Sequence, residues 1–277
     1  MNSGPVLKSR TSPTLGSAYR VLAPHYNQIM AHVDYPHWAR HYRSLWGKFR
    51  GRKAPDRMLE LAAGTCRFAV HQPFPSAFVV YSDLNFDMLS AFAGAPHAMP
   101  PQRPAPLPRL TCNAQALALR GPFDLVLMAY DSLNYLLKPD EVLKTFHEAR
   151  EILAPGGLFL FDVTTDACSR RHFSSATEFG ELDPMEPDQP YSSSYVRISR
   201  YDAPSRMQLN LFTFFLAESD GRYVRREEIH RQRIYPAGHL RKFAREAGFR
   251  VRACLADFTF KPGTERHDRL HFVLQKP

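Results

Sequence analysis

The sequence predicts an α/β fold built on a doubly wound parallel sheet, and two segments carry the prediction. The apolar run RMLEL at 57–61 leads into the small-residue turn AAG at 62–64, a pattern typical of a buried strand followed by a tight turn. A second apolar run, FVVY at 78–81, ends near Asp83, nineteen residues after Gly64. In doubly wound folds an acid at this spacing holds the ribose hydroxyls of a nucleoside.

Composition limits the classes of protein that the chain can belong to. Its 277 residues, 44% of them hydrophobic, predict one large domain or one domain with an insertion. No apolar run approaches the roughly 18 residues that span a membrane, and the first residues lack the apolar segment of a secretory signal. We therefore expect a cytoplasmic protein. The net charge of +9 is compatible with nucleic acid, an anionic substrate or simple solubility.

The four cysteines are widely scattered and include no C-x-x-C pair. This distribution predicts reduced thiols and supports neither a disulfide framework nor a zinc site. His37 and His41 lie four residues apart on a predicted helix, but no acidic third ligand stands at a useful spacing. We predict no metal site.

Periodicity places the regular elements. Residues 1–17 are polar and are expected to be disordered, and a helical stretch in two pieces follows from residue 18, with Asp34 and Pro36 at the start of the second piece. Pro139 opens a helix that Pro155-Gly156-Gly157 ends. Further helices are expected at 85–93 and 237–247. Further strands are expected at 110–112, 125–130, 158–163, 249–258 and 269–276.

The segment between 164 and 235 differs in character from the rest of the chain. Residues 164–194 mix acids and prolines and predict a mobile loop. Three strands are then expected near 194–202, 206–217 and 222–235, because polar and apolar residues alternate between turn signals. A parallel sheet has no need of this meander. We therefore assign the core to residues 18–165 and 236–277, and an inserted loop and β-meander roof to residues 166–235.

The stretch around residue 60 resembles motif I of the class I S-adenosylmethionine (SAM)-dependent methyltransferases, E/D-x-G-x-G-x-G, with Glu60, Ala62, Gly64 and Cys66 at its four positions. Two of the three glycines are therefore replaced. The helix at 139–153 followed by L-x-P-G-G and a strand resembles the same class, as does the C-terminal order of helix, AGF and two strands. The resemblance covers residues 18–277. The meander resembles the roof of sugar-amine N,N-dimethyltransferases and glycine N-methyltransferase-like proteins.

This resemblance implies a Rossmann-like, seven-stranded sheet with an antiparallel last strand, and SAM as the cofactor. It implies a lid role for Tyr19 and Tyr26, whose hydroxyls would reach the cofactor's carboxylate. Asn113 stands where the family often has an acid for the adenine amine, and its amide oxygen can accept that bond. The cofactor-binding residues expected from the resemblance are Tyr26, Glu60, Ala62, Ala63, Gly64, Asp83, Leu84, Met88, Asn113, Ala114, Met128 and Ser132.

Methyl transfer from SAM is an in-line displacement, so the protein mainly aligns the reactants and excludes water. A base is needed only where the acceptor loses a proton, and the candidates are Tyr130, Asp131 and His230. Arg200 and Arg231 are predicted to lie beneath the roof and to clamp a carboxylate or phosphate of the acceptor. The alternative is a solvated basic face balanced by Glu227 and Glu228.

We expect a SAM-dependent methyltransferase that acts on the nitrogen or oxygen of a small molecule, and three other functions are its alternatives. An NAD(P) oxidoreductase needs a small residue where the chain has Arg67. An RNA-modifying methyltransferase suits the basic charge, but the D/N-P-P-Y/F tetrapeptide is absent from MAYDSLNY at 128–135. Ala62 and Cys66 motivate the third alternative, a degenerate SAM- or nucleotide-binding protein without catalysis.

Overall fold

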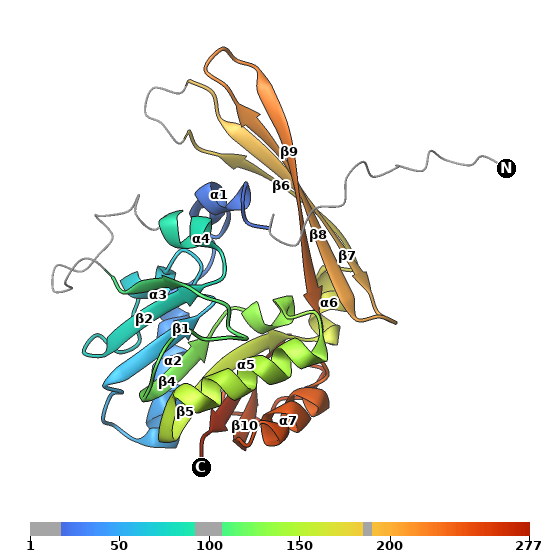
Figure 1. Cartoon of the computed structure of the whole chain (residues 1–277). Helices are drawn as coiled ribbons and strands as arrows, with labels where there is room; N and C mark the ends of the chain where they lie inside the picture. The colour runs from blue at the N-terminus through green and yellow to red at the C-terminus, as the bar shows by residue number, and fades with distance from the viewer. Residues whose placement is uncertain (1–17, 92–106, 185–189) are drawn as a thin grey trace.

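The computed structural model describes residues 18–91, 107–184 and 190–277, which form two β-sheets with helices around them (Figure 1). The expectation of disorder for residues 1–17 concerns residues outside these ranges. None of the described helices is long and apolar enough to cross a membrane.

The larger sheet, called here the core sheet, confirms the predicted fold class. Its strand order is β10-β11-β5-β4-β1-β2-β3. The five neighbouring strands β5, β4, β1, β2 and β3 pair in parallel. Strand β11 runs antiparallel to both of its neighbours, β5 and β10. The strands are β1 (Arg57–Leu61), β2 (Phe78–Asp83), β3 (Arg109–Thr111), β4 (Phe123–Met128), β5 (Leu153–Thr164), β10 (Arg250–Ala256) and β11 (Arg269–Gln275).

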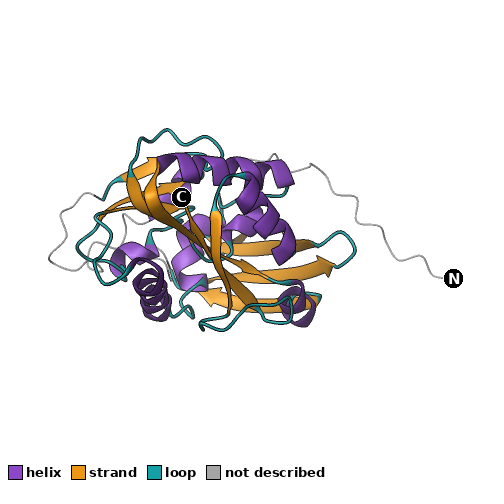
Figure 2. Ribbon diagram, turned by 90° about the horizontal axis from the view of Figure 1, so that it is seen from below, coloured by secondary structure: helices purple, strands orange, loops and turns teal. Residues whose placement is uncertain are grey.

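Helices cover both faces of the core sheet (Figures 1 and 2). Helix α2 (Tyr35–Arg50) starts as predicted, because the Asp34 side chain accepts the His37 N–H at 2.8 Å and Pro36 lies in the first turn. It packs on one face, and α5 (Pro139–Ile152) and α7 (Ala237–Glu246) pack on the other. The remaining helices are α1 (Leu22–Ile29), α3 (Arg67–Val70), α4 (Phe86–Ser90), α6 (Asp166–His172) and the 3-10 helix η3 (Ser132–Tyr135).

The apolar runs of the central strands follow from this double cover. Along β5, Leu158 and Leu160 face the α2 side, while Phe159 and Phe161 face the α5 and α7 side, and all four are fully buried. Successive side chains of a strand point to opposite faces, so a strand covered on both faces is apolar throughout. The loops at the carboxyl ends of these strands are where such sheets bind ligands.

The smaller sheet, called here the roof sheet, has four antiparallel strands in the order β6-β7-β8-β9 and stands above the core sheet in Figure 1. The three predicted strands are confirmed, but the expectation of an irregular loop at 164–194 is wrong, because α6 and β6 lie within it. Strand β6 pairs with β7 along its whole length. These pairs are main-chain hydrogen bonds, which form without any alternation of apolar and polar residues in the sequence of β6. The strands are β6 (Ser175–Leu182), β7 (Ser193–Asp202), β8 (Met207–Ala217) and β9 (Tyr223–Arg233).

One face of the roof sheet is buried and the other faces solvent. Helix α1 packs on the buried face, where Leu22 and Ile29 join Leu182, Phe212 and Phe214 in a small core of their own. We call this buried side the inner face. Its other members include Tyr195, Ser199, Gln208, Asn210, Glu228, His230 and Gln232.

Two neutral histidines are buried between α2 and β11. The rings of His41 and His271 lie 4.4 Å apart, and among the described residues neither His41 Nε2 nor either ring nitrogen of His271 has a hydrogen-bond partner. Burial lowers the pKa of His41 to about 4 and that of His271 well below its ordinary value. Both imidazoles are therefore uncharged in the folded protein at neutral pH.

The free energy of unfolding should fall as the pH is lowered. A histidine with a depressed folded-state pKa contributes its full stability above the unfolded value near 6.5, and that stability is lost as the pH falls from 6.5 towards 4. Protonation of His41 alone should lower the free energy of unfolding by about 2 kcal/mol between pH 7 and pH 5. Urea unfolding at both pH values should show a smaller loss for His41→Gln and an unchanged loss for the exposed His147→Gln. Equal losses in all three proteins would contradict this account.

Candidate active site

The loop after β1 is built from residues in the left-handed region of backbone conformation. The φ angles are +52° at Ala62, +56° at Gly64 and +54° at Cys66. A side chain at position 64 would be strained at this φ, and its Cβ would lie 3.2 Å from Cε of Met88. The loop joins the end of β2, because the Ala63 N–H binds the Ser82 carbonyl at 2.9 Å.

Cys66, which replaces the third glycine of the motif, points into the core. Its side chain is fully buried beside Phe68 and Ala69 under α2. Burial raises the pKa of the Cys66 thiol, so the group stays neutral. The Cys66 side chain therefore fills space in the core. On the other side of the loop, a ligand would meet backbone atoms only.

Asp83 lies at the end of β2 and is fixed by main-chain donors. Its Oδ2 accepts the Gly64 N–H and its Oδ1 accepts the Asn85 N–H, both at 2.8 Å. Burial raises the pKa of the carboxyl, and these bonds oppose the rise. Each carboxylate oxygen keeps a lone pair that can accept a further hydroxyl. Next to this carboxylate, Leu84 exposes 68% of its surface, so an apolar group lies open beside a polar one.

Glu60, Met128 and Ser132 also lie at the carboxyl ends of the central strands. Glu60 is buried in β1, Met128 is the buried last residue of β4, and the Ser132 hydroxyl donates to the Ala129 carbonyl at 2.7 Å. Met88 is buried in α4 against the Gly64 loop. These residues therefore share one edge of the sheet.

Asn113 and Ala114 form the turn after β3, next along the same edge. The Asn113 side chain is exposed, and its amide oxygen accepts the Gln115 N–H at 2.9 Å. A carboxamide oxygen has two lone pairs, so one remains for an external donor. The other lone pair accepts the Gln115 N–H within the turn.

The N-terminal segment brings three tyrosines together at this edge. The Tyr19 ring centre lies 6.3 Å from that of Tyr26 and 5.8 Å from that of Tyr135, which belongs to η3. We call these three residues the tyrosine cluster. Burial raises the pKa of all three phenols, so each hydroxyl remains protonated.

The turn after β4 is held by a carboxylate within β5. Asp162 is fully buried and accepts the Tyr130 N–H at 2.7 Å, the Asp131 N–H at 2.9 Å and the Tyr42 hydroxyl at 2.9 Å. Arg269 Nη1 also binds Asp162, and it binds Asp131 at 3.0 Å. Tyr130 and Asp131 have φ angles of +61° and +47°. The carboxylate thus holds two successive residues in a strained conformation.

Tyr130 and Asp131 point to different surroundings. The Tyr130 ring packs 5.2 Å from Trp38, on the α2 side, and its burial raises the pKa of the phenol. Burial also raises the pKa of Asp131, although Arg269 opposes the rise. Asp131 Oδ2 accepts a hydrogen bond from Gln232 of the roof sheet at 2.7 Å. Asp131 therefore joins the core sheet to the roof sheet.

His230 lies on the inner face of the roof sheet and is in contact with the tyrosine cluster. Its ring centre is 4.6 Å from that of Tyr19 and 6.2 Å from that of Tyr135. Its Nε2 lies 3.1 Å from Oε1 of Glu228, two residues earlier on the same face. Within the described parts of the chain, Nδ1 has no hydrogen-bond partner.

Arg200 and Arg231 do not lie beneath the roof sheet, and this prediction is wrong. Both are exposed, and the strand register places them in line across Leu209 on the outer face. The reason is the register of β9. It turns Glu228, His230 and Gln232 to the inner face and therefore turns Arg231 to the outer face. Arg197 does lie on the inner face, where it pairs with Glu178 at 2.5 Å.

Three residues of the site, Asp162, Gln232 and Arg269, are not among those predicted from the sequence. Asp162 had a visible signal, since an acid within the apolar run LFLFDV is buried only when it is paired. Gln232 lies in a strand whose apolar residues suggested the opposite face. Arg269 begins an ordinary strand and carries no signal in the sequence.

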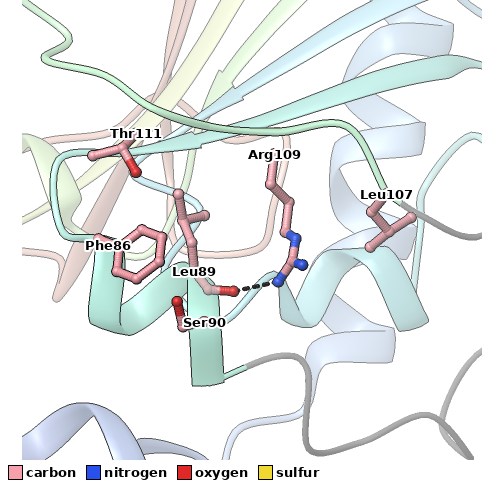
Figure 3. Close-up of a pocket in the computed structure, with 6 residues that line it drawn as sticks. All are labelled: Phe86, Leu89, Ser90, Leu107, Arg109 and Thr111. Carbon is pink, nitrogen blue, oxygen red and sulfur yellow. Dashed lines mark hydrogen bonds between the residues drawn. The ribbon is translucent and has the colours of Figure 1, made fainter.

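A separate pocket of about 330 Å³ opens beside α4 and β3 (Figure 3). The Arg109 guanidinium crosses it and donates to the Leu89 carbonyl at 2.5 Å. The pocket borders residue 107, where a described range begins. Its lining is Phe86, Leu89, Ser90, Leu107, Arg109 and Thr111.

One group of side chains has the composition of a metal site, although the sequence predicted none. Ligand atoms of Cys168, His172 and Asp268 lie within 4.8 Å of one another. Arg171 Nη2, however, binds Asp268 at 2.5 Å and places a positive charge beside the group. This cation opposes the binding of a second one.

The chain is similar over nearly its whole length to two proteins that are named as methyltransferases. No model of a protein family matches the sequence. A protein of Geobacillus sp. (strain WCH70) named "Putative methyltransferase" is 29% identical over 264 residues, which are 93% of this chain and 99% of that protein. "Putative methyltransferase YqeM" of Bacillus subtilis (strain 168) is 28% identical over 93% of this chain and 97% of its own length.

Solved structures share the fold over nearly the whole chain. An S-adenosylmethionine-dependent methyltransferase from Clostridium acetobutylicum superposes with a TM-score of 0.69 at 21% identity, covering 93% of this chain and 98% of its own. The sugar N-methyltransferase KedS8 from Streptoalloteichus gives a TM-score of 0.71 at 16% identity, covering 99% and 98%.

Removal of the Asp162 carboxylate should strongly destabilise the protein. In Asp162→Ala the Arg269 guanidinium and two turn amides lose their buried acceptor, which should cost about 3–5 kcal/mol of unfolding free energy. Asp268→Ala removes the exposed partner of Arg171 and should cost at most about 1 kcal/mol. Urea denaturation measures both. Similar losses in the two variants would show that Asp162 does not carry this role.

Proposed function

We propose that the chain is a class I SAM-dependent methyltransferase and that it methylates the nitrogen of a small-molecule amine held beneath the roof sheet. The observation that carries the proposal is the group of side chains at this place. The tyrosine cluster lies against His230, and the carboxylates of Asp131 and Glu228 flank it. The acceptor would bind between this group and the ends of the core strands.

The residues at the ends of β1 and β2 fit SAM. When bound, SAM supplies a methyl group that its sulfonium already activates for displacement. The bare backbone at Gly64 lets a ligand approach the loop closely, and Asp83 can accept both ribose hydroxyls. The exposed side chain of Leu84 offers an apolar surface to the adenine. Asn113 has one lone pair for the adenine amine.

We assign the cofactor to residues 18–165 and 236–277, and much of the acceptor site to the roof at 166–235. Two links support this division of labour. Gln232 joins the roof to Asp131, at the carboxyl end of β4, and Asn134 Nδ2 donates to the Arg233 carbonyl at 2.7 Å. The roof is thereby fixed over the edge of the core sheet.

An amine is favoured over an anionic acceptor by the charges around the site. Aromatic faces and carboxylates attract a cation, and the tyrosine cluster supplies the former while Asp131 and Glu228 supply the latter. The arginines predicted to hold an anion, Arg200 and Arg231, lie on the outer face. The two arginines nearer the site are already paired, Arg197 with Glu178 and Arg269 with Asp162 and Asp131. The sugar N-methyltransferase among the structural neighbours acts, by its name, on nitrogen. An RNA acceptor has less support, because this basic face points away from Asp131.

An ammonium group must lose a proton before its nitrogen can attack, and we assign that step to His230. A hydrogen bond from Nε2 to the Glu228 carboxylate fixes the tautomer that leaves a lone pair on Nδ1. Nδ1 would then take the proton as the amine becomes neutral. Tyrosine hydroxyls would orient the nitrogen, and the roof sheet would exclude water.

SAM and S-adenosylhomocysteine should stabilise the folded protein, and Asp83 should carry much of the affinity. Ligand at a hundredfold excess over its Kd adds about 2.7 kcal/mol, which a thermal melt detects. Asp83→Ala removes the acceptor of two ribose hydroxyls, so calorimetry should give a Kd raised tenfold or more. Asp87→Ala, an exposed acid in the next helix, serves as the control. A melt that responds to NAD and not to SAM would refute the cofactor assignment.

His230→Gln should lower the rate of methyl transfer without loss of cofactor affinity. Removal of a general base costs about 10²–10⁴ in rate. S-adenosylhomocysteine release from a panel of amino sugars and amino alcohols, measured from pH 6 to 9, identifies the acceptor and the rate. The exposed His239→Gln is the matched control. A wild-type rate in His230→Gln would exclude the base role, and turnover of the hydroxyl analogues alone would exclude an amine acceptor.

A further inference from the structure

Glu228 stands at the meeting point of the roof sheet and the N-terminal segment. It is 4% exposed on the inner face of β9. Its Oε1 accepts the Tyr19 N–H at 2.5 Å, and its Oε2 accepts the N–H groups of Val21 and Leu22 at 2.5 and 2.8 Å. One carboxylate therefore binds three amides that lie more than 200 residues away in the sequence.

These bonds replace a cap that α1 lacks. The residue before the helix is Val21, which makes no side-chain capping bond. The first amides of a helix have no partner within the helix, and their positive end attracts a carboxylate. Glu228 in turn needs these donors, because a buried carboxylate is stable only when its oxygens are bonded. The helix and the acid thus stabilise each other across two parts of the chain.

The opposite side of the same segment binds the loops of the proposed cofactor site. The Asn85 side chain donates to the Ala18 carbonyl at 2.9 Å, and the Thr65 hydroxyl donates to Asn27 at 2.8 Å. Asn85 and Thr65 lie beside Asp83 and Gly64, respectively. Residues 18–29 therefore bridge the cofactor loops and the roof sheet.

We propose that Glu228 is a positioning residue that couples the two halves of the site. It latches the N-terminal segment over the cofactor, and through Oε1 it also orients His230 towards the acceptor. When the segment is released, the Glu228 carboxylate loses its three amide donors. The group that orients His230 is then no longer fixed itself. The acceptor site is then complete only while the segment encloses the cofactor. The inference rests on the proposed function for the identity of that cofactor.

The test compares Glu228→Gln with Glu227→Gln, the neighbouring acid on the exposed outer face of β9. Hydrogen exchange of the full chain should show amides of residues 19–22 exchanging at least tenfold faster in Glu228→Gln. Amides of β4 and β5 should keep their protection, which reports an intact fold. The dissociation rate of S-adenosylhomocysteine, followed by stopped flow, should rise about tenfold in Glu228→Gln and stay unchanged in Glu227→Gln.

Unchanged exchange at residues 19–22 in Glu228→Gln would overturn the latch. Faster exchange with an unchanged dissociation rate would overturn the coupling to the cofactor. Failure of the wild-type protein to bind S-adenosylhomocysteine would refute the proposed function instead. The exchange measurement on the free protein distinguishes the two failures, because it requires no ligand.

Discussion

The arrangement of the site depends on one buried carboxylate, that of Asp162. A fully buried acid near the carboxyl end of a strand that is covered on both faces is stable only if its oxygens are bonded. Its donors come from α2, from the turn after β4 and from β11. Because two of them are successive backbone amides, the acid also fixes the left-handed conformation of Tyr130 and Asp131. The position of Asp131 at the sheet edge follows from this constraint.

From Asp131 the same polar chain continues into the roof sheet. Gln232 binds Asp131, Gln208 binds Gln232 at 3.2 Å, and Asn210 accepts the Ser199 hydroxyl at 2.8 Å on the next strand. Buried polar groups in such a chain are costly to separate, because each would lose its partner. The Gln232–Asp131 bond therefore joins the two sheets, and the other bonds of the network hold β7, β8 and β9 of the roof sheet together.

Most of the core sheet could be predicted from the sequence, because its signals are local. The apolar run of β5 and Pro139 in α5 each act within a few residues. The expected stop at Pro155-Gly156-Gly157 lies slightly too late, since α5 ends at Ile152 and β5 already contains these three residues. Strand β6 was missed because it forms by pairing with β7, and its own sequence resembles a loop. The face of β9 was assigned incorrectly for a related reason. Glu228 and Gln232 are buried because their partners, near residues 21 and 131, lie far away in the chain.

The small core between α1 and the roof sheet affects how the protein can be synthesised. Leu22 and Ile29 leave the ribosome early, whereas Leu182, Phe212 and Phe214, the apolar residues that they contact, leave it much later. Until then the apolar side of this helix has no native surface to cover it. Contacts between residues so distant in sequence form slowly, and exposed apolar surface promotes aggregation. A nascent chain that stalls before β8 would therefore present an uncovered helix to the chaperones of the cell.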